Sequence, residues 1–563
     1  MLRITCRDKP WLKFYDRRIP EHIEYEPACL PEFLDRSAAG FPDRPALIFE
    51  GYRITFRELK DMVDQCAACL SRFGITRGDS VAILLPNVVP LVVSYFAVLK
   101  TGAVAVVNNP LYSDPELERQ FNDSGSRLLI TLDILANRMI ALRPRTSIRT
   151  IIHCSLGDYL PRAKKILFRL VGGRMNLAAS VRRDQDVYSW KTCMERGTGE
   201  ETAVSPVLQG EDIAMYQYTG GTSGVSKAVM LTHRNLSTQV QALRMWFQDV
   251  AGRETVILGA LPFFHIFGLT AVMNLAVYLG WTTVLLPRPQ PKAILAAVRK
   301  YRPLFAPLVP AMFIGILKEP ALRRTDMSCL VGCFSGGAPL PVEVMHDFEK
   351  TTGVAIMEGF GMTETSPVTH VNPVTGRSRK VGSVGIPISD TECRIVDLDT
   401  GTDDVPAGGR GELLVRGPQV MKGYKDASGQ EEQLLKEGWL HTGDIATMDE
   451  DGFFYIVGRK KDVIISSGYN IYPRDIDDVF TQHPKVRETF TVGVPDERRG
   501  ESVKVFVVPR EGATVTEEEL LAFCRDKLAK YKWPAHIEFR RELPRTRAGK
   551  IDRMALKDTA RDA

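Results

Sequence analysis

The sequence has little excess of charge of either sign. Its 563 residues include 73 Lys and Arg against 68 Asp and Glu, which gives a formal net charge of +5. A nucleic-acid-binding protein of this size usually shows a much stronger basic excess, so the composition argues against nucleic acid as a partner. Low-complexity tracts and internal repeats are also absent, which excludes fibrous and solenoid classes. With 44% hydrophobic and 25% charged residues, the chain is typical of a folded protein with a large core.

A complete set of zinc ligands is also missing. The ten cysteines are scattered, and the close pairs Cys66/Cys69 and Cys329/Cys333 each lack a second ligand pair nearby. The first 18 residues carry charge but no apolar core of a secretory signal. We therefore expect reduced, buried thiols and a cytoplasmic protein.

One uncharged run challenges that expectation. Residues 257–286 contain no Asp, Glu, Lys or Arg, and a run of this length can span a bilayer. Pro262, His265 and three glycines interrupt it, however. A buried strand, turn, helix and strand in a large α/β core produces the same hydropathy, and we favour that interpretation over a membrane-embedded acyl carrier or transporter.

The apolar runs alternate with helical patterns through most of the chain. Residues 80–86 and 103–107 read as buried strands, and residues 91–100 between them read as a helix. This rhythm predicts parallel sheets covered by helices. After the charged linker at 458–462 the pattern changes to a compact α+β unit. The predicted fold is therefore a large N-terminal α/β domain, 1–460, and a small C-terminal α+β domain, 461–563.

A basic segment between Asp158 and Arg183 carries more charge than its surroundings. It holds seven Lys or Arg against the single carboxylate of Asp158, and apolar residues at 166–168 and 170–171 lie between the charges. A solvated helix face explains this pattern. The alternative explanation of the pattern is a basic amphipathic helix that lies on an anionic membrane surface.

The strongest chemical signal is a loop at residues 218–227, Tyr-Thr-Gly-Gly-Thr-Ser-Gly-Val-Ser-Lys, which follows a strand-like run. Glycines let backbone N–H groups converge on an anion, hydroxyls donate hydrogen bonds, and Lys227 adds a positive charge. The loop is not a Walker A motif, because Ser226 rather than glycine precedes Lys227. Taken alone, such a loop is also a common turn.

The loop closely resembles the phosphate loop of the adenylate-forming superfamily, which includes acyl-CoA synthetases, luciferases and peptide-synthetase adenylation domains. Further motifs follow in the order of that family. The strings at 261–267 (LPFFHIF), 109–112 (NPLY) and 9–13 (KPWLK) are most similar to bacterial long-chain fatty acid–CoA ligases. Ser226 stands where the family commonly has Pro, and Ala228 where it commonly has Gly.

The resemblance implies an enzyme that joins a fatty acid to CoA at the expense of ATP, with Mg²⁺ as cofactor. An acyl-adenylate forms first, and AMP and pyrophosphate are released. It assigns Thr222 and Glu364 to Mg²⁺, and His265 to orienting the fatty carboxylate. The nucleotide-binding set that it implies comprises Thr219, Gly220, Gly221, Thr222, Ser223, Gly224, Lys227, Gly336, Gly337, Ala338, Glu358, Gly359, Phe360, Gly361, Thr363, Asp444 and Arg459.

The C-terminal motif Pro544–Arg553 resembles the catalytic lysine motif of the same family, with Lys550 at the position of the lysine. A lysine that bridges carboxylate and α-phosphate would neutralise charge developing in the transition state. By resemblance, Lys461 is the hinge about which the small domain rotates, and Gly468 and Tyr469 lie along the CoA path.

Several alternatives stay open on the sequence. They are a medium-chain or aryl acid–CoA ligase, a fatty acyl-AMP ligase that loads a carrier protein, and a binding module without activity. Peripheral contact with the inner membrane and a homodimer are further expectations about partners.

Overall fold

The computed structural model describes residues 4–198, 206–219, 226–247, 254–373, 378–427, 434–466, 469–496, 498–525, 527–545 and 551–561. The chain forms two compact units. The larger consists of Leu12–Glu392 and Arg416–Gly438, and the smaller of Met1–Trp11, Cys393–Val415 and Trp439–Ala563.

The first sheet of the larger unit has eight strands in the order β19-β9-β8-β4-β3-β5-β6-β7. Its centre is parallel and completely buried, as the continuous apolar runs predict. The strands are β3 (Ser80–Leu84), β4 (Val104–Val107), β5 (Leu128–Leu132), β6 (Thr150–Cys154), β7 (Val187–Ser189), β8 (Ile213–Thr219), β9 (Lys227–Thr232) and β19 (Gly423–Tyr424).

The second sheet has nine strands in the order β16-β15-β14-β13-β12-β10-β11-β1-β2. Parallel pairing brings the carboxyl ends of β12, β13 and β14 to one edge. The strands are β1 (Pro45–Phe49), β2 (Tyr52–Thr55), β10 (Val256–Gly259), β11 (Thr282–Leu285), β12 (Phe305–Leu308), β13 (Gly332–Ser335), β14 (Ile356–Gly361), β15 (Val368–Val371) and β16 (Ile386–Pro387).

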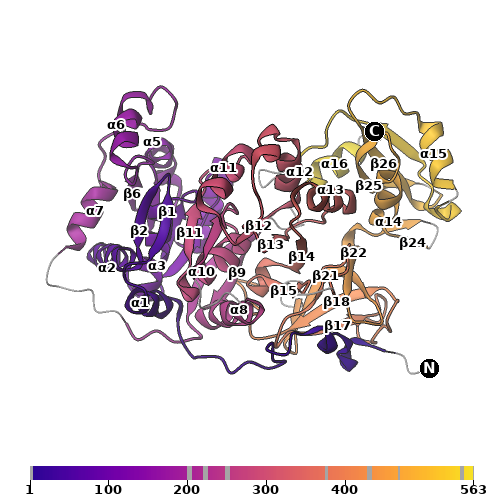
Figure 1. Ribbon diagram of the computed structural model, residues 1–563, viewed down its shortest axis with the longest axis horizontal. Coiled ribbons are helices and arrows are strands. Elements are labelled where there is room, and N and C mark those ends of the chain that lie inside the picture. The colour runs from indigo at the N-terminus through magenta and orange to yellow at the C-terminus, as the bar shows by residue number, and fades with distance from the viewer. Residues whose placement is uncertain are drawn as a thin grey trace. The chain divides into compact units, whose positions relative to one another are not determined.

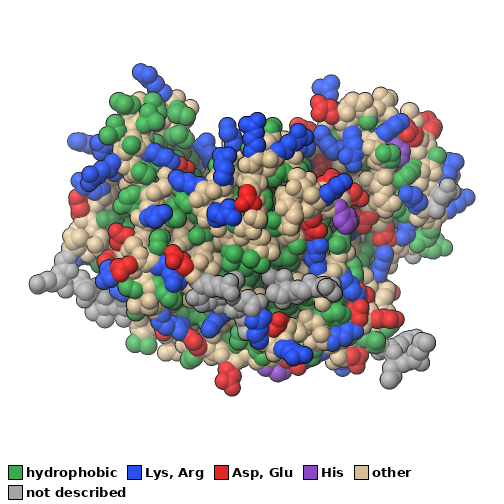
Figure 2. Space-filling model, in the orientation of Figure 1, with side chains coloured by type: hydrophobic (Ala, Val, Ile, Leu, Met, Phe, Trp, Pro, Cys, Tyr) green, Lys and Arg blue, Asp and Glu red, His purple; other side chains and the backbone are tan. Residues whose placement is uncertain are grey.

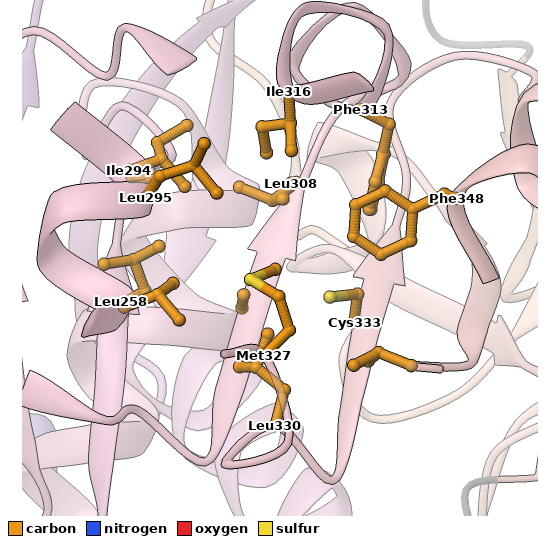
Figure 3. Close-up of a cluster of buried hydrophobic side chains, with 14 of the residues drawn as sticks. Leu258, Ile294, Leu295, Leu308, Phe313, Ile316, Met327, Leu330, Cys333 and Phe348 are labelled. Atoms are coloured by element: carbon orange, nitrogen blue, oxygen red, sulfur yellow. The ribbon is translucent and has the colours of Figure 1, made fainter. Parts of the chain in front are cut away.

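Helices cover both sheets of this unit. Figure 3 shows side chains of α11 and α12 meeting those of the nine-stranded sheet, with the Phe313 and Phe348 rings edge to face at 5.1 Å between centroids. The helices are α1 (Leu30–Gly40), α2 (Phe56–Arg72), α3 (Val89–Lys100), α4 (Asp114–Ser124), α5 (Asp133–Leu142), α6 (Arg162–Val171), α7 (Trp190–Gly197), α8 (His233–Trp246), α11 (Pro291–Tyr301), α12 (Pro310–Lys318) and α13 (Val342–Thr352).

The uncharged run at 257–286 forms the predicted buried strand, turn, helix and strand. It contains most of β10, then α9 (Ile266–Gly268), a π-helical turn η4 (Leu269–Asn274), α10 (Leu275–Leu279) and β11. In the described part of the chain, no helix has both the length and the apolar character needed to cross a membrane.

The smaller unit contains two sheets, of which the second combines antiparallel strands with one parallel pair (Figure 1). One holds β17 (Glu392–Val396), β18 (Gly411–Arg416), β21 (Trp439–Met448) and β22 (Phe454–Arg459). In the other, the long hairpin of β25 and β26 carries helices and an apolar core. Its elements are β23 (Ile464–Ser466), β24 (Tyr469–Ile471), β25 (Val486–Asp496), β26 (Gly500–Pro509), β27 (His536–Phe539), α14 (Pro473–Thr481), α15 (Glu517–Arg525) and α16 (Arg553–Arg561). The α/β and α+β classes predicted for the two parts are confirmed.

Candidate active site

The predicted phosphate loop connects the antiparallel strands β8 and β9. Thr219 and Lys227 lie opposite each other in the ladder, so both ends of the loop are anchored at one point of the eight-stranded sheet. Gly220, Gly221, Thr222, Ser223 and Gly224 lie outside the described residues. Their assignment to phosphate and Mg²⁺ therefore stays a prediction.

Lys227 and Glu364 are linked through a tyrosine that the sequence analysis did not identify. The Lys227 Nζ atom lies 5.5 Å from the centroid of the Tyr424 ring. The Tyr424 hydroxyl donates a hydrogen bond of 2.7 Å to Oε1 of Glu364, and this contact is buried. Tyr424 reaches this place because β19 adds to the edge of β9. No sequence spacing connects positions 364 and 424.

Glu364 is held in a geometry that suits a hard cation. The residue is only 8% exposed, and the N–H of Met421 donates to its backbone carbonyl at 2.8 Å. Within the described residues, Oε1 is bonded to Tyr424 and Oε2 makes no hydrogen bond. No cluster of three or more carboxylate, His or Cys ligands is present there either. One carboxylate oxygen beside substrate phosphates is a typical Mg²⁺ environment, so the residues fit the predicted cofactor.

Small residues at the ends of β13 and β14 form a close-fitting wall. Ser335 and Glu358 are paired in the ladder, and Glu358 is buried. A β-carbon at Gly336 would lie 3.0 Å from the Phe267 ring, and one at Gly361 would lie 1.9 Å from the carbonyl oxygen of Pro367. A side chain at Gly361 would thus clash with backbone, and one at Gly336 would press against the Phe267 ring.

The other members of the predicted adenine and α-phosphate set lie on the same segments. Phe360 and Thr363 are half-buried, and the Phe360 ring is edge to face with His370, 6.0 Å between centroids. Gly337 and Ala338 are exposed beyond the end of β13. The structure thus brings the 336–338 turn, Gly359 and Phe360 to one edge of the nine-stranded sheet.

His265 is fixed at the N-terminus of α9. Its Nδ1 accepts from the N–H of Phe267 at 3.3 Å, so a neutral ring in this arrangement carries its proton on Nε2. The sequence did not point to Asn87, yet its buried side-chain amide holds the turn that precedes His265. It donates to the carbonyls of Gly259 and Leu261 and accepts from the N–H of Phe263.

His265 lies at an apolar pocket with about 850 Å³ of empty space, a figure that includes open solvent. The walls are mainly aliphatic and aromatic, and the side chains with polar atoms are those of His265, Ser335 and Trp246. The residues that line it are Leu243, Trp246, Phe247, Ile257, His265, Ile266, Phe267, Ala271, Leu275, Phe305, Pro307, Phe334, Ser335, Gly336, Gly337, Gly359, Phe360, Gly361, Met362, Pro367, Val368 and Val371.

The two residues predicted to bind ribose meet in the smaller unit. Asp444 on β21 and Arg459 on β22 lie opposite each other, with Arg459 Nε 2.8 Å from Asp444 Oδ1. Asp444 is 3% exposed, and its N–H donates to Thr442 Oγ1 at 3.0 Å. A carboxylate oriented in this way can accept from hydroxyl groups.

Glu412 supports this turn and was not anticipated from the sequence. It accepts hydrogen bonds from the N–H of Gly443 at 3.2 Å and from Lys460 Nζ at 2.9 Å. Burial works to raise the pKa of Glu412, but hydrogen bonds from His441 and Lys460 outweigh it and lower the pKa to about 2.

The lowered pKa of Glu412 predicts how the stability of the smaller unit depends on pH. Because the folded pKa of Glu412 lies below its ordinary value of 4.5, its stabilising effect is complete above about pH 4.5 and disappears as the pH falls towards 2. The effect is at most about 3 kcal/mol. Glu412→Gln should therefore be less stable than the parent at pH 7, with a difference that shrinks below pH 4 in urea titrations. An unchanged difference would contradict the assignment.

The remaining predicted residues lie in the predicted hinge and in the C-terminal part. Lys461 is in the 3₁₀ turn Lys460–Asp462 that follows β22, and burial lowers its pKa. Tyr469 is exposed and stacks on Tyr531 with centroids 4.6 Å apart. Gly468 and Lys550 lie outside the described residues.

Comparison with known proteins identifies the family to which the chain belongs. The model of the AMP-binding enzyme family matches residues 34–425, and that of the AMP-binding enzyme C-terminal domain matches 475–550. The long-chain-fatty-acid–CoA ligase of Bacillus subtilis is 42% identical over 97% of both chains. That of Escherichia coli O6:H1 is 38% identical over 98% of both.

Solved structures give the same result. ATP-bound MatB from Rhodopseudomonas palustris superposes with a TM-score of 0.79 at 27% identity, over 94% of this chain and 99% of that one. The chain therefore belongs to the AMP-binding enzyme family. Within that family it is an ATP-dependent, AMP-forming acid–thiol ligase that uses CoA. The predicted resemblance, enzyme class and ATP and CoA substrates are confirmed.

Proposed function

We propose that this AMP-forming ligase activates long-chain fatty acids. The observation that carries the proposal is the apolar pocket at His265, whose walls offer a fatty chain almost no polar partner. Because each buried methylene contributes about 0.8 kcal/mol to binding, an apolar pocket binds long chains more tightly than short ones. The names of the Bacillus subtilis and Escherichia coli relatives support the same substrate class.

Adenylation requires two anions, the fatty carboxylate and ATP, to meet. Lys227 and the N–H groups of the phosphate loop hold the β- and γ-phosphates, and Phe360 packs on adenine. The neutral His265 ring donates from Nε2 to a carboxylate oxygen and orients the acid. Asp444 accepts from the ribose hydroxyls. Glu364 and Thr222 would hold Mg²⁺, which when bound offsets phosphate charge. Lys550 adds the last cation at the reacting carboxylate.

Thioester formation follows in the same site. We place the boundary of the mobile domain between residues 460 and 461, with Lys461 as the hinge. Rotation there withdraws Lys550 and brings Gly468 and Tyr469 to the path of the CoA thiol. A hinge built from a short 3₁₀ turn can absorb such a rotation over a few backbone dihedrals.

The cellular setting is also part of the proposal. We infer a cytoplasmic enzyme that contacts the inner membrane peripherally, since long-chain acids partition into lipid and must be taken from it. The homodimer expected from the sequence stays a prediction, which light scattering after gel filtration tests directly.

The pocket assignment predicts a change of chain-length preference. Ala271 lines the pocket from the π-helical turn, so Ala271→Phe places a ring where a long chain would lie. If about three methylenes lose their place, the cost is about 2.4 kcal/mol, or roughly 50-fold in kcat/KM for palmitate. Activity on octanoate should stay within about threefold.

The experiment measures acyl-CoA and AMP from acetate, octanoate, palmitate, oleate and a cinnamate. Ala296→Phe is the matched control, because Ala296 is exposed on α11. Parent activity that peaks at octanoate or cinnamate would overturn the long-chain assignment. The latter result would favour an aryl acid, the substrate in the name of a 31% identical rice relative, 4-coumarate–CoA ligase 2. AMP release without acyl-CoA would indicate a carrier protein as acceptor.

A further inference from the structure

Helix α6 presents an apolar face to solvent. None of its residues is buried. Ile166, Leu167 and Leu170 are 62%, 58% and 71% exposed, and their spacing of three and four residues places them on one face. We call these three residues the apolar ridge. A surface helix normally turns such a face to the core, so this orientation needs a partner.

The opposite face explains why the ridge points outward. Phe168 turns back toward the body of the unit, where a β-carbon at Gly157 would lie 2.7 Å from its ring. Lys164 is bound to Glu50 Oε2 at 2.6 Å, and Lys165 donates to the carbonyl of Asp158 at 3.3 Å. The helix is thus held by one aromatic ring and two lysines, and its outward orientation is fixed.

Cations flank the apolar ridge. Arg162, Arg169 and Arg174 are exposed and form no ion pair with any residue that the structure describes. Figure 2 shows hydrophobic side chains edged by Lys and Arg where Figure 1 places α6. Met175, 61% exposed, extends the apolar surface beyond the helix. Apolar side chains with arginines at their margin match the interface of an anionic lipid layer, where acyl chains lie beneath negative headgroups.

We propose that α6 docks the enzyme on an anionic lipid surface, with the apolar ridge inserted among the headgroups and the three arginines bound to phosphates. The inference rests on the membrane contact proposed above and names the surface that makes it. It does not depend on which acid the pocket accepts. Neither the apolar ridge nor the arginines line that pocket, so docking and chemistry can be tested separately.

The test compares sedimentation of the full-length protein with vesicles of phosphatidylcholine alone and with one quarter phosphatidylglycerol. We expect binding to the anionic vesicles that weakens with salt, and at least tenfold weaker partition for the ridge variant I166S/L167S/L170S. R162Q/R169Q/R174Q should lose the preference for anionic lipid. The control R299Q/R323Q/R324Q removes the same charge from exposed arginines on α11 and on the 3₁₀ helix Pro320–Arg324 that follows α12, and should change partition less than twofold.

Insertion itself has a direct readout. In Leu170→Trp, the emission added relative to the parent should shift to shorter wavelength with anionic vesicles. Octanoate activation in lipid-free buffer should be unchanged in every variant, which separates loss of docking from loss of fold or function. Equal partition of parent and ridge variant, or no binding by the parent, would overturn the proposal. Ridge variants that turn a dimer into a monomer while keeping vesicle binding would assign the face to a second copy instead.

Discussion

Glu364→Gln should lower the rate of acyl-AMP formation by about 10²–10³-fold. The substitution keeps the shape of the side chain but removes the charge, and preorganised charge beside transferring phosphoryl groups contributes on this scale. Because Tyr424 donates to Oε1, the glutamine can retain that bond, and the loss reports on Oε2. ATP–pyrophosphate exchange measured across a Mg²⁺ titration gives the result, with saturation moved to higher Mg²⁺.

Two further variants make this prediction specific. Tyr424→Phe removes the hydroxyl that orients the carboxylate, and a lost hydrogen bond to a charged group costs about 1.5 kcal/mol, or roughly tenfold. Glu343→Gln removes an exposed carboxylate on α13 and should have no effect. A double variant of Glu364 and Tyr424 no slower than Glu364→Gln alone would show that the hydroxyl acts through the carboxylate. Unchanged exchange in Glu364→Gln would contradict its assignment to the cation.

Lys550→Gln should separate the two half-reactions. We expect acyl-AMP formation to fall by about 10³-fold, since the cation that offsets charge in the transition state is lost. Thioester formation from supplied acyl-AMP should stay within about threefold, because Lys550 has withdrawn in that step. Pyrophosphate exchange measures the first reaction, and CoA-dependent AMP release from acyl-AMP measures the second.

Lys530→Gln is the matched control, because Lys530 is exposed in the same part of the chain and has no role in either step. Equal losses in both half-reactions would mean that the substitution damages the C-terminal fold rather than the adenylation step. Retention of both reactions would show that another residue supplies the cation.

Features that depend on residues close together in the sequence could be predicted from the sequence. The strand and helix periods gave the α/β and α+β classes, because buried parallel strands must be continuously apolar. The resemblance then gave the enzyme class and the individual residues of the phosphate loop, of the 358–365 segment and of the ribose turn. The pairing of Asp444 with Arg459 agrees with the shared ribose site that the resemblance implied.

Contacts between distant segments could not be predicted. Tyr424 reaches Glu364 only because β19 joins the edge of β9, and Glu412 supports the ribose turn only because β18 pairs with β21. Such contacts depend on strand order, which local patterns leave undetermined.

The basic segment at 158–183 shows most clearly the difference between what local sequence predicts and what tertiary structure decides. Its charge and its amphipathic pattern follow from the sequence, and they fit a solvated helix face and a membrane-binding helix alike. Tertiary structure alone decided that Phe168 turns inward while Ile166, Leu167 and Leu170 face solvent. The sequence by itself determined the class of enzyme and predicted the residues of its motifs. The fold determined which distant side chains meet and which apolar face is left uncovered, because both depend on how the elements pack rather than on their local period.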